Sequence, residues 1–192
     1  MYNPVKPYNA KTIDLIRKTW KTPYLSILEG VYPIIKKRFS GLEIDHVDGI
    51  GTKGIYHWEK GTFKNAVLDA LAMNLNDMAL VRAVPYKLQD QITIPQEDER
   101  LLKVLKALSD ECVKRKIAIT GGETSFHKNI NALDISLSVS GFVKKKTNNQ
   151  FKVGDLLIGL ESNGIHSNGF TLVRKLFKKQ FKKEFIAPTY IY

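Results

Sequence analysis

The sequence predicts an α/β or α+β domain in which one sheet carries helices on a face. Three observations support this class. Helical and strand-like patterns alternate along the chain from residue 41 onward. The 192 residues are 43% hydrophobic, which is enough for one core without a disulfide or a structural metal. The chain has one cysteine and no apolar run near the roughly 18 residues of a membrane span, so we expect no intrachain disulfide and no membrane partner.

The first 40 residues carry weak patterns. Prolines at positions 4, 7, 23 and 33 interrupt them. We expect an irregular N-terminal extension over residues 1–40, with room for one short helix around Thr12–Trp20. The extension lacks an apolar signal core, and together with the single cysteine this predicts a cytoplasmic location.

The pattern sharpens between residues 41 and 94. Leu42–Val47 alternates weakly and runs into a glycine-rich turn at Asp48–Lys53, which predicts a strand followed by a loop. Apolar residues at helical spacing over residues 63–78 predict a helix that ends in a polar cluster. Residues 86–94 alternate as a strand.

Residues 97–116 predict the strongest helix, because acidic side chains occupy the first turn and basic ones the last. Cys112 lies on the apolar stripe of this helix, so we expect a core residue rather than a nucleophile. Ile117–Thr120 predicts a short strand that ends in a turn at Gly121–Thr124. Leu133–Val143 predicts a longer strand.

The last part of the sequence continues the alternation. A polar loop over residues 144–150 precedes an apolar strand at Asp155–Leu160. Ser162–Gly169 is a polar turn, and Phe170–Phe181 predicts a basic amphipathic helix. Residues 187–192 are expected to be extended.

The net charge is +11, and residues 144–192 contribute +7 of it. A phosphate-rich partner and a solvated lysine-rich face both account for this excess. Nucleic-acid binding is the weakest hypothesis, because the aromatic residues of the basic tail fit the apolar stripe of a helix better than a stacking platform. No paired-cysteine or His-Glu-x-x-His pattern predicts zinc, and we interpret His46, His57 and His127 as incidental.

Four polar turns recur at the ends of the predicted elements. They are Asp48–Lys53, Asn76-Asp77, Gly121–Thr124 and Ser162–Gly169. Carboxylates bind Mg²⁺, glycine-rich backbone cradles phosphates and a lysine neutralises them, so the set suits a metal–nucleotide. No Walker pattern is present, which excludes a P-loop. The last turn precedes a helix, where backbone N–H groups form an anion site.

Each turn also has a plain structural interpretation. The first could be a tight turn with a salt-bridged lysine, the second a helix C-cap, and the third an ordinary turn with a surface carboxylate. Ser167 or Asn168 could serve only as the N-cap of the last helix. The residues alone leave these alternatives open.

Taken in order, the turns resemble the family of phosphoribosylformylglycinamidine cyclo-ligase (aminoimidazole ribonucleotide, or AIR, synthetase), a ligase of purine biosynthesis. The resemblance rests on Asp-Gly-Ile-Gly-Thr-Lys at 48–53, Asn-Asp at 76–77, Gly-Gly-Glu-Thr at 121–124, Asp134, Gly-Asp-Leu-Leu-Ile-Gly-Leu at 154–160, Ser-Asn-Gly-Ile-His-Ser-Asn-Gly-Phe at 162–170 and Pro-Thr-Tyr-Ile-Tyr at 188–192. The ordered set covers about residues 41–192.

The resemblance implies a mixed sheet with helices on one face, which pairs with a second subunit into a barrel across a homodimer. It implies an N-terminal-type domain over residues 41–187 and the start of an interdomain link at 188–192. It also implies a C-terminal domain, which we expect to be absent from this chain. Either the chain is a natural split half with a separate C-terminal-domain partner, or it is a fragment of a longer product.

The implied reaction uses ATP and Mg²⁺ to cyclise formylglycinamidine ribonucleotide to AIR. The implied nucleotide site comprises Asp48, Gly49, Gly51, Thr52, Lys53, Asn76, Asp77, Gly121, Gly122, Glu123 and Thr124. The implied ribonucleotide site comprises Ser162, Asn163, Gly164, His166, Ser167 and Asn168. Asp48 and Asp77 would bind Mg²⁺, Lys53 would neutralise phosphate charge, and His166 would be a proton shuttle. The alternative is a non-catalytic nucleotide-binding or dimerisation module of the same fold.

Overall fold

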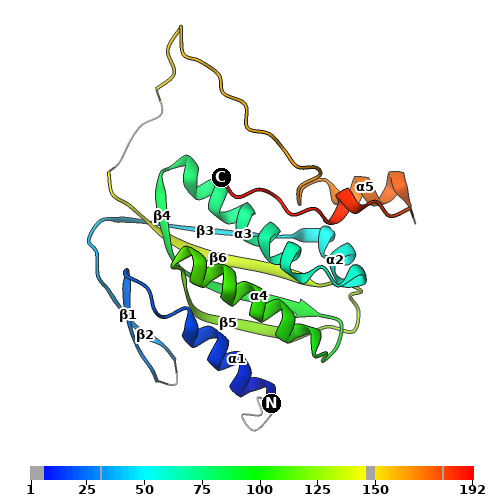
Figure 1. The fold of residues 1–192 in the computed structure, drawn as a ribbon, viewed down its shortest axis with the longest axis horizontal. Coiled ribbons are helices and arrows are strands. Elements are labelled where there is room, and N and C mark those ends of the chain that lie inside the picture. Colours follow the sequence, from blue (N-terminus) through cyan, green and yellow to red (C-terminus); the bar gives the residue numbers. More distant parts are fainter. Residues whose placement is uncertain (1–6, 31, 146–149, 179) are drawn as a thin grey trace.

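A four-stranded mixed sheet forms the centre of the computed structural model, which describes residues 7–30, 32–145, 150–178 and 180–192 (Figure 1). Its strand order is β3 (Leu42–Gly49), β6 (Asp134–Val143), β4 (Ala83–Ile94) and β5 (Ala118–Phe126). The pairs β3–β6 and β6–β4 are antiparallel, and β4–β5 is parallel. A parallel pair needs a crossover, and α4 (Arg100–Arg115) supplies it.

The helices α3 (Phe63–Leu80) and α4 cover one face of this sheet (Figure 1). The core lies between them and the sheet. It includes Ile50, Ala66, Val67, Ala70, Leu71, Leu88, Ile92, Val104, Leu108, Cys112, Ile135, Leu137 and Val139. Cys112 is fully buried there, as predicted, and burial raises the pKa of its thiol well above the usual range. The predicted fold class, a mixed sheet with helices on one face, is confirmed.

The opposite face of the sheet is polar over most of its length. Gln89 and Gln91 of β4 are exposed, and Ser136 and Ser138 of β6 are half-buried. One end of this face is covered by a hairpin of β1 (Leu25–Leu28) and β2 (Ile34–Lys37), through a small cluster of apolar and aromatic side chains. The cluster contains Leu25, Phe39, Tyr86, Ala118 and Phe142.

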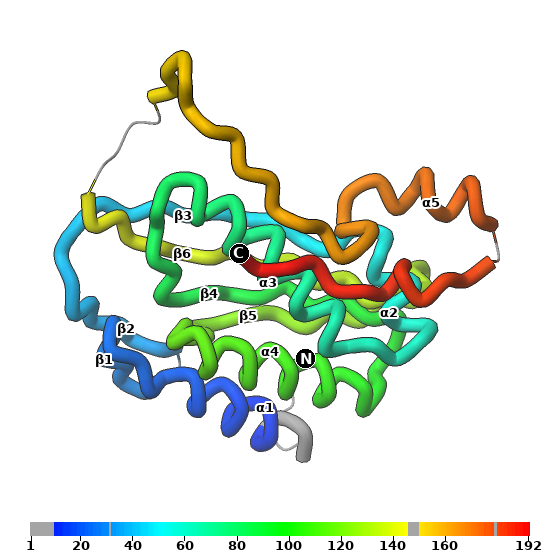
Figure 2. The backbone as a smooth tube through the Cα atoms, turned by 45° about the horizontal axis from the view of Figure 1, so that its top comes forward, coloured from blue at the N-terminus to red at the C-terminus, as the bar shows by residue number. Residues whose placement is uncertain are grey.

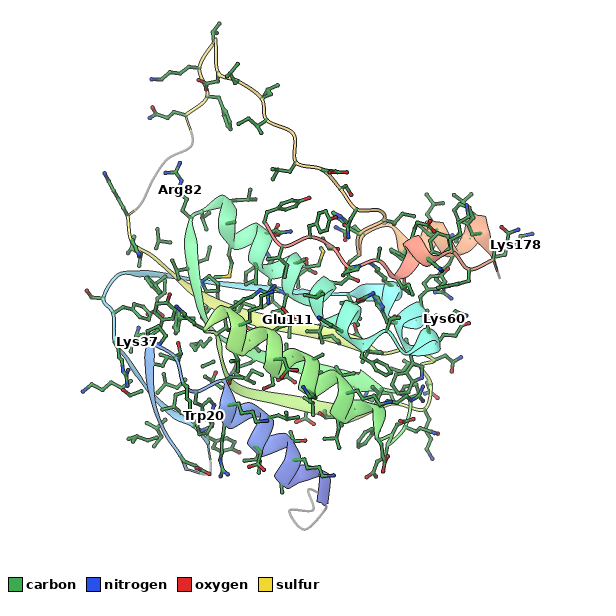
Figure 3. All side chains as sticks on the ribbon, viewed as in Figure 1. Trp20, Lys37, Lys60, Arg82, Glu111 and Lys178 are labelled. Carbon is green, nitrogen blue, oxygen red and sulfur yellow. The ribbon has the colours of Figure 1, made fainter. Side chains whose placement is uncertain are left out.

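The first 40 residues are more regular than expected in their described part, because they form this hairpin. The short helix expected around Thr12–Trp20 is present and begins earlier, as α1 (Pro7–Lys18), which packs against α4. Trp20, after the end of α1 (Figure 3), donates from Nε1 to the carbonyl of Ile119 at 2.8 Å. Thr19 Oγ1 accepts from the Ile119 N–H at 2.9 Å. These two bonds fix the extension to β5. They join residues about 100 positions apart in the sequence, so no local pattern could have indicated them.

Two further expectations fail. Residues 121–124 are not a turn, because β5 continues through them to Phe126, paired with β4. Asp155–Leu160 forms no strand: it is extended and lies apart from the body of the molecule, in the segment that returns from the projecting tip toward α5 (Figure 2). A strand needs a neighbour to complete its hydrogen bonds, and no described part of the chain supplies one. Of the loop expected at 144–150, residues 146–149 lie outside the described residues.

The C-terminal part packs on the helical side of the sheet. The short helices η1 (Gly51–Lys53) and α2 (Gly54–Lys60) follow β3, and α5 (Phe170–Phe177) and η2 (Lys183–Ile186) pack on them through aromatic contacts around Tyr56. The last residues run alongside α3 (Figure 2). No helix in the described ranges has the length and apolar character to cross a membrane.

Candidate functional site

The glycine-rich segment after β3 turns in close contact with the start of β6. A Cβ at Gly54 would lie 1.7 Å from the carbonyl oxygen of Leu133, so only glycine fits there. Gly51 has φ of +54°, which also favours glycine. Ile50, directly before Gly51, is fully buried, and its backbone N–H donates to the Ile135 carbonyl at 3.0 Å. This turn directs the side chain of Lys53 inward.

Asp48 and Asp77, the predicted magnesium ligands, lie on adjoining elements at the contact of β3 with α3. Asn74 Nδ2 donates to the Asp48 carbonyl at 3.1 Å, and its Oδ1 lies 3.0 Å from His46 Nδ1. His46 Nε2 lies 3.1 Å from the carboxylate of Asp77, which is half exposed. Asp48 Oδ1 accepts from the N–H of Gly49 at 2.7 Å. His46 thus has contacts with both Asn74 and Asp77, which the sequence did not indicate.

This pair of carboxylates fits magnesium only together with a phosphate ligand. The described residues contain no group of three or more His, Cys, Asp or Glu side chains that could hold a metal ion. Magnesium in nucleotide sites commonly uses one or two carboxylates, with waters and phosphate oxygens completing its octahedron. Asp48 and Asp77 could supply two carboxylates at most, so phosphate and water would have to complete the coordination.

Lys53 does not face an open phosphate site. Its side chain is fully buried, and Nζ lies 2.7 Å from Asp69 Oδ2, which also lies 2.8 Å from His57 Nε2. Burial lowers the pKa of Lys53 although Asp69 acts to raise it. Burial acts to raise the pKa of Asp69, but the hydrogen bond from His57 and the charge of Lys53 bring it below its usual value. In this conformation Lys53 is therefore not placed to contact a phosphate, and the phosphate role stays a prediction.

His57, interpreted as incidental from the sequence, belongs to the same buried cluster. Its Nδ1 lies 2.8 Å from Thr62 Oγ1, and burial lowers its pKa. Neither Asp69 nor His57 was singled out by sequence reasoning. A carboxylate on the buried face of a predicted amphipathic helix was the signal that could have found Asp69.

The loop at Ser162–Asn168 lies beside this cluster. Lys53 Nζ donates to the carbonyl of Ile165 at 3.3 Å, which places His166 next to a fixed backbone position. His166 Nε2 lies 3.2 Å from Ser162 Oγ, and Asn163 Nδ2 donates to the carbonyl of Pro188.

Two side-chain polar atoms of the loop are buried and lack a hydrogen-bond partner in the described part of the chain. Ser167 Oγ and Asn163 Oδ1 have no hydrogen-bond partner among the residues that the structure describes. Gly169 is the N-cap of α5 and provides no side-chain cap, so the alternative of an N-cap by Ser167 or Asn168 is wrong. Buried polar atoms are normally satisfied by protein, water or ligand, so water or a ligand would have to satisfy these two atoms.

Gly121–Thr124 lies apart from these residues. It belongs to β5, which is separated from β3 by β6 and β4. Gly122 packs closely on Asp90, since a Cβ there would lie 2.3 Å from Asp90 Oδ1. Asp90 was missed from the sequence: it occupies a buried position of β4, and burial raises its pKa to about 7.

An open cavity of about 470 Å³ lies at the end of the sheet. Gly51 and Thr52 line it together with Thr93, His127 and Asp134. Burial raises the pKa of Asp134. The volume is in the range of small-ligand sites. The structure thus places Gly51 and Thr52 at this cavity and the loop before α5 next to Lys53. Gly121–Thr124 lies in β5, on the edge of the sheet opposite β3.

Comparison with known proteins places the chain in a family. Residues 44–143 match the family described as "AIR synthase related protein, N-terminal domain". The phosphoribosylformylglycinamidine cyclo-ligase of Sulfurisphaera tokodaii is 36% identical over 156 residues, 77% of this chain and 49% of that protein. The enzyme of the same name from Saccharolobus solfataricus is 34% identical over 197 residues, 98% of this chain and 60% of that protein. The Pyrococcus furiosus relative is 40% identical over 134 residues, 67% and 40% of the two chains.

The chain thus spans about half the length of these relatives. Among solved structures, thiamine-monophosphate kinase from Stenotrophomonas maltophilia has a TM-score of 0.54 at 21% identity, covering 68% of this chain and 41% of that one. Hydrogenase maturation protein HypE in complex with ATP has a TM-score of 0.52 at 15% identity, covering 72% and 40%. These two likenesses support the fold alone. The chain belongs to the AIR synthase related protein family, whose N-terminal domain it contains.

Proposed function

We propose that this chain supplies the N-terminal half of a phosphoribosylformylglycinamidine cyclo-ligase, which cyclises formylglycinamidine ribonucleotide to AIR with ATP and Mg²⁺. The names of its relatives support this reaction. The structural observation that carries the proposal is the loop before α5, where Ser167 Oγ and Asn163 Oδ1 are buried without a partner in the described chain.

In this proposal the loop binds the ribonucleotide. The N-terminus of α5 has backbone N–H groups without a side-chain cap, and such N–H groups attract phosphate. Ser167 Oγ can donate a hydrogen bond to a phosphate oxygen, and Asn163 Oδ1 can accept one from a ribose hydroxyl. His166, half-buried beside Ser162, is placed to move a proton during ring closure.

The nucleotide binds, in this proposal, near the end of β3. ATP with Mg²⁺ supplies the phosphoryl group that converts the amide oxygen into a leaving group. Asp48 and Asp77 provide carboxylate oxygens for the metal. Gly51 and Thr52 line the open cavity beside Asp134 and offer close backbone approach to a ligand.

We further propose a homodimer formed through the sheet. Three strand spacings separate β5 from β3, roughly 14 Å, so Gly121–Thr124 and Asp48 of one chain do not share a site. The polar sheet face is open beyond the β1–β2 hairpin, and within the described ranges no strand pairs with the outer edge of β5. In a symmetric dimer through this face, β5 of one copy can complete the nucleotide wall of the other.

A further domain, of the kind that the greater length of the relatives allows, completes the enzyme in this proposal. Leu156, Leu157 and Ile158 are each more than 80% exposed. The segment that carries them lies apart from the body of the molecule (Figure 2). Adjacent residues of a strand point to opposite faces, so an apolar run of this kind is typical of a strand buried on both faces. The Saccharolobus relative extends well beyond the part that this chain matches. A C-terminal domain of that kind can cover the exposed run.

A non-catalytic nucleotide-binding or dimerisation module is the second candidate. The observation that favours it is the exposed run itself, because an uncovered half-site cannot exclude water from the reacting groups. Both candidates predict nucleotide binding, and only the first predicts ring closure.

The deciding experiment is a cyclisation assay on the purified chain, with and without the 40% of the Saccharolobus relative that this chain does not match, supplied in trans. We expect little or no turnover alone and turnover on addition of the second polypeptide. Absence of turnover with a demonstrably bound C-terminal domain would favour the second candidate. Robust turnover by the chain alone would refute the requirement for a second polypeptide.

Calorimetry tests the metal assignment separately. Binding of Mg²⁺–ATP should weaken at least tenfold in Asp48→Asn and in Asp77→Asn. Asp14→Asn, on the exposed side of α1, is the control. Unchanged affinity in both site variants would remove the two carboxylates from the metal site. Light scattering at micromolar concentration tests the dimer, and a monomer would contradict it.

A further inference from the structure

Lys53 has no free hydrogen-bond donor. Its ammonium group carries three N–H bonds. They point to Asp69 Oδ2 at 2.7 Å, the carbonyl of Ala187 at 2.8 Å and the carbonyl of Ile165 at 3.3 Å. The side chain is fully buried. Contact with a phosphate would require Lys53 to give up these partners.

Asp69 is the centre of the same cluster and is equally saturated. Its Oδ2 accepts from Lys53 and faces His57 Nε2 at 2.8 Å. Its Oδ1 accepts from the backbone N–H of Thr189 at 2.8 Å and from the Thr189 hydroxyl at 2.7 Å. A buried ion pair with all its hydrogen bonds formed fixes geometry, whereas one with a missing partner is strongly destabilising.

The cluster joins three segments that are far apart in sequence. Lys53 and Asp69 belong to η1 and α3, Ile165 to the loop before α5, and residues 187–189 to the C-terminal segment. Asn65 Nδ2 strengthens the same junction by donating to the Ile186 carbonyl at 2.7 Å. Among the described residues, the loop's other side-chain bonds are the one from Asn163 Nδ2 to the Pro188 carbonyl and exposed contacts within the loop itself.

We infer that Lys53 and Asp69 are positioning residues, a buried ionic clasp that holds the Ser162–Asn168 loop and residues 187–189 in place for ligand binding. Lys53 acts on the loop through the Ile165 carbonyl and does not contact the nucleotide phosphates. An apolar side chain of the same length could fill the space but could not bind two carbonyls from different segments. The identity of the loop's ligand rests on the proposed function, whereas the clasp itself does not.

Hydrogen–deuterium exchange on the whole chain tests the clasp without any ligand. Lys53→Met keeps the length of the side chain and removes its donors. We expect backbone exchange in segments 162–168 and 186–190 to accelerate at least tenfold, with β6 unchanged. Lys64→Met, on the exposed side of α3, is the matched control and should leave all segments unchanged. Unchanged exchange in both segments of a folded Lys53→Met protein overturns the inference.

Thr189→Val provides a second variant in case Lys53→Met does not fold. It removes the hydroxyl bond to Asp69 and preserves the shape of the side chain. We expect faster exchange in residues 186–190 and a smaller change in residues 162–168. If Lys53→Met does not fold and Thr189→Val leaves exchange in both segments unchanged, the inference is overturned.

Ligand binding separates positioning from direct contact. With ribose 5-phosphate as the probe of the loop, Lys53→Met should lose at least tenfold in affinity. Its affinity for Mg²⁺–ATP should stay within twofold of the parent. The reverse pattern, lost Mg²⁺–ATP affinity with an unchanged loop, would assign Lys53 to the phosphates. If the parent chain binds neither probe, the proposed function fails, and the exchange experiment still decides the clasp.

Discussion

Gly54→Ala should be one of the most damaging single-methyl additions in this protein. The new Cβ would lie 1.7 Å from the Leu133 carbonyl oxygen and 3.0 Å from the Leu133 carbonyl carbon. Ordinary contact begins near 3.4 Å, so the start of α2 and the residue preceding β6 must separate by about 1.7 Å. Both atoms belong to backbone, so no side-chain rotation relieves the clash. Overpacking commonly costs about 1–3 kcal/mol, and we expect about 3 kcal/mol here.

Urea unfolding followed by tryptophan fluorescence measures this cost. With a slope near 2 kcal/mol per molar urea, the midpoint should fall by about 1.5 M at unchanged slope. Gly51→Ala is the matched control in the same segment, because φ is +54° there and nothing lies within 4 Å of the added methyl group. It should lose only about 1 kcal/mol through backbone strain. A Gly54→Ala midpoint at or above that of Gly51→Ala would refute the steric argument.

Three further predictions use buried and exposed positions. The pKa of Asp90 is raised from an ordinary 3.8 to about 7 in the folded state, so between these two pH values the folded state binds a proton that the unfolded state has lost. The free energy of unfolding should therefore fall by roughly 4 kcal/mol as the pH rises from about 4 to 7. Asp90→Asn should remove this pH dependence in urea titrations at several pH values. Cys112 should resist alkylation at pH 8 until the protein is unfolded, as mass spectrometry can show, because its thiol is buried and its pKa raised. Leu157→Ser should change the unfolding free energy by less than about 0.5 kcal/mol, whereas Leu71→Ala should lose about 2–5 kcal/mol by the same assay.

The sequence alone predicted the elements that cover and form the core. The alternation at residues 86–94 and 133–143, and the helical spacing at 63–78 and 97–116, correspond to β4, β6, α3 and α4. These patterns are reliable because each records which side of one element faces the apolar interior. The order of the polar motifs also indicated the family, which the comparisons confirm.

Pairing decided the elements that sequence reasoning got wrong. Gly121 and Gly122 have poor strand propensity, yet they lie in β5 because β4 offers them a parallel neighbour. Residues 155–160 have strong strand character and form no strand, because no described segment pairs with them. Strand formation depends on a partner that is distant in sequence, and a local pattern cannot report whether that partner exists.

The candidate site shows the same division. The sequence identified the loop before α5, and the structure places unpartnered buried polar atoms in it. It could not show that Lys53 is buried, since that depends on Asp69 and on carbonyls 112 and 134 residues farther along the chain. A charged side chain such as that of Lys53 is buried only where tertiary contacts satisfy each of its donors. The sequence therefore determines the chemical type of each side chain in the candidate site, whereas the folded structure decides whether that side chain is exposed.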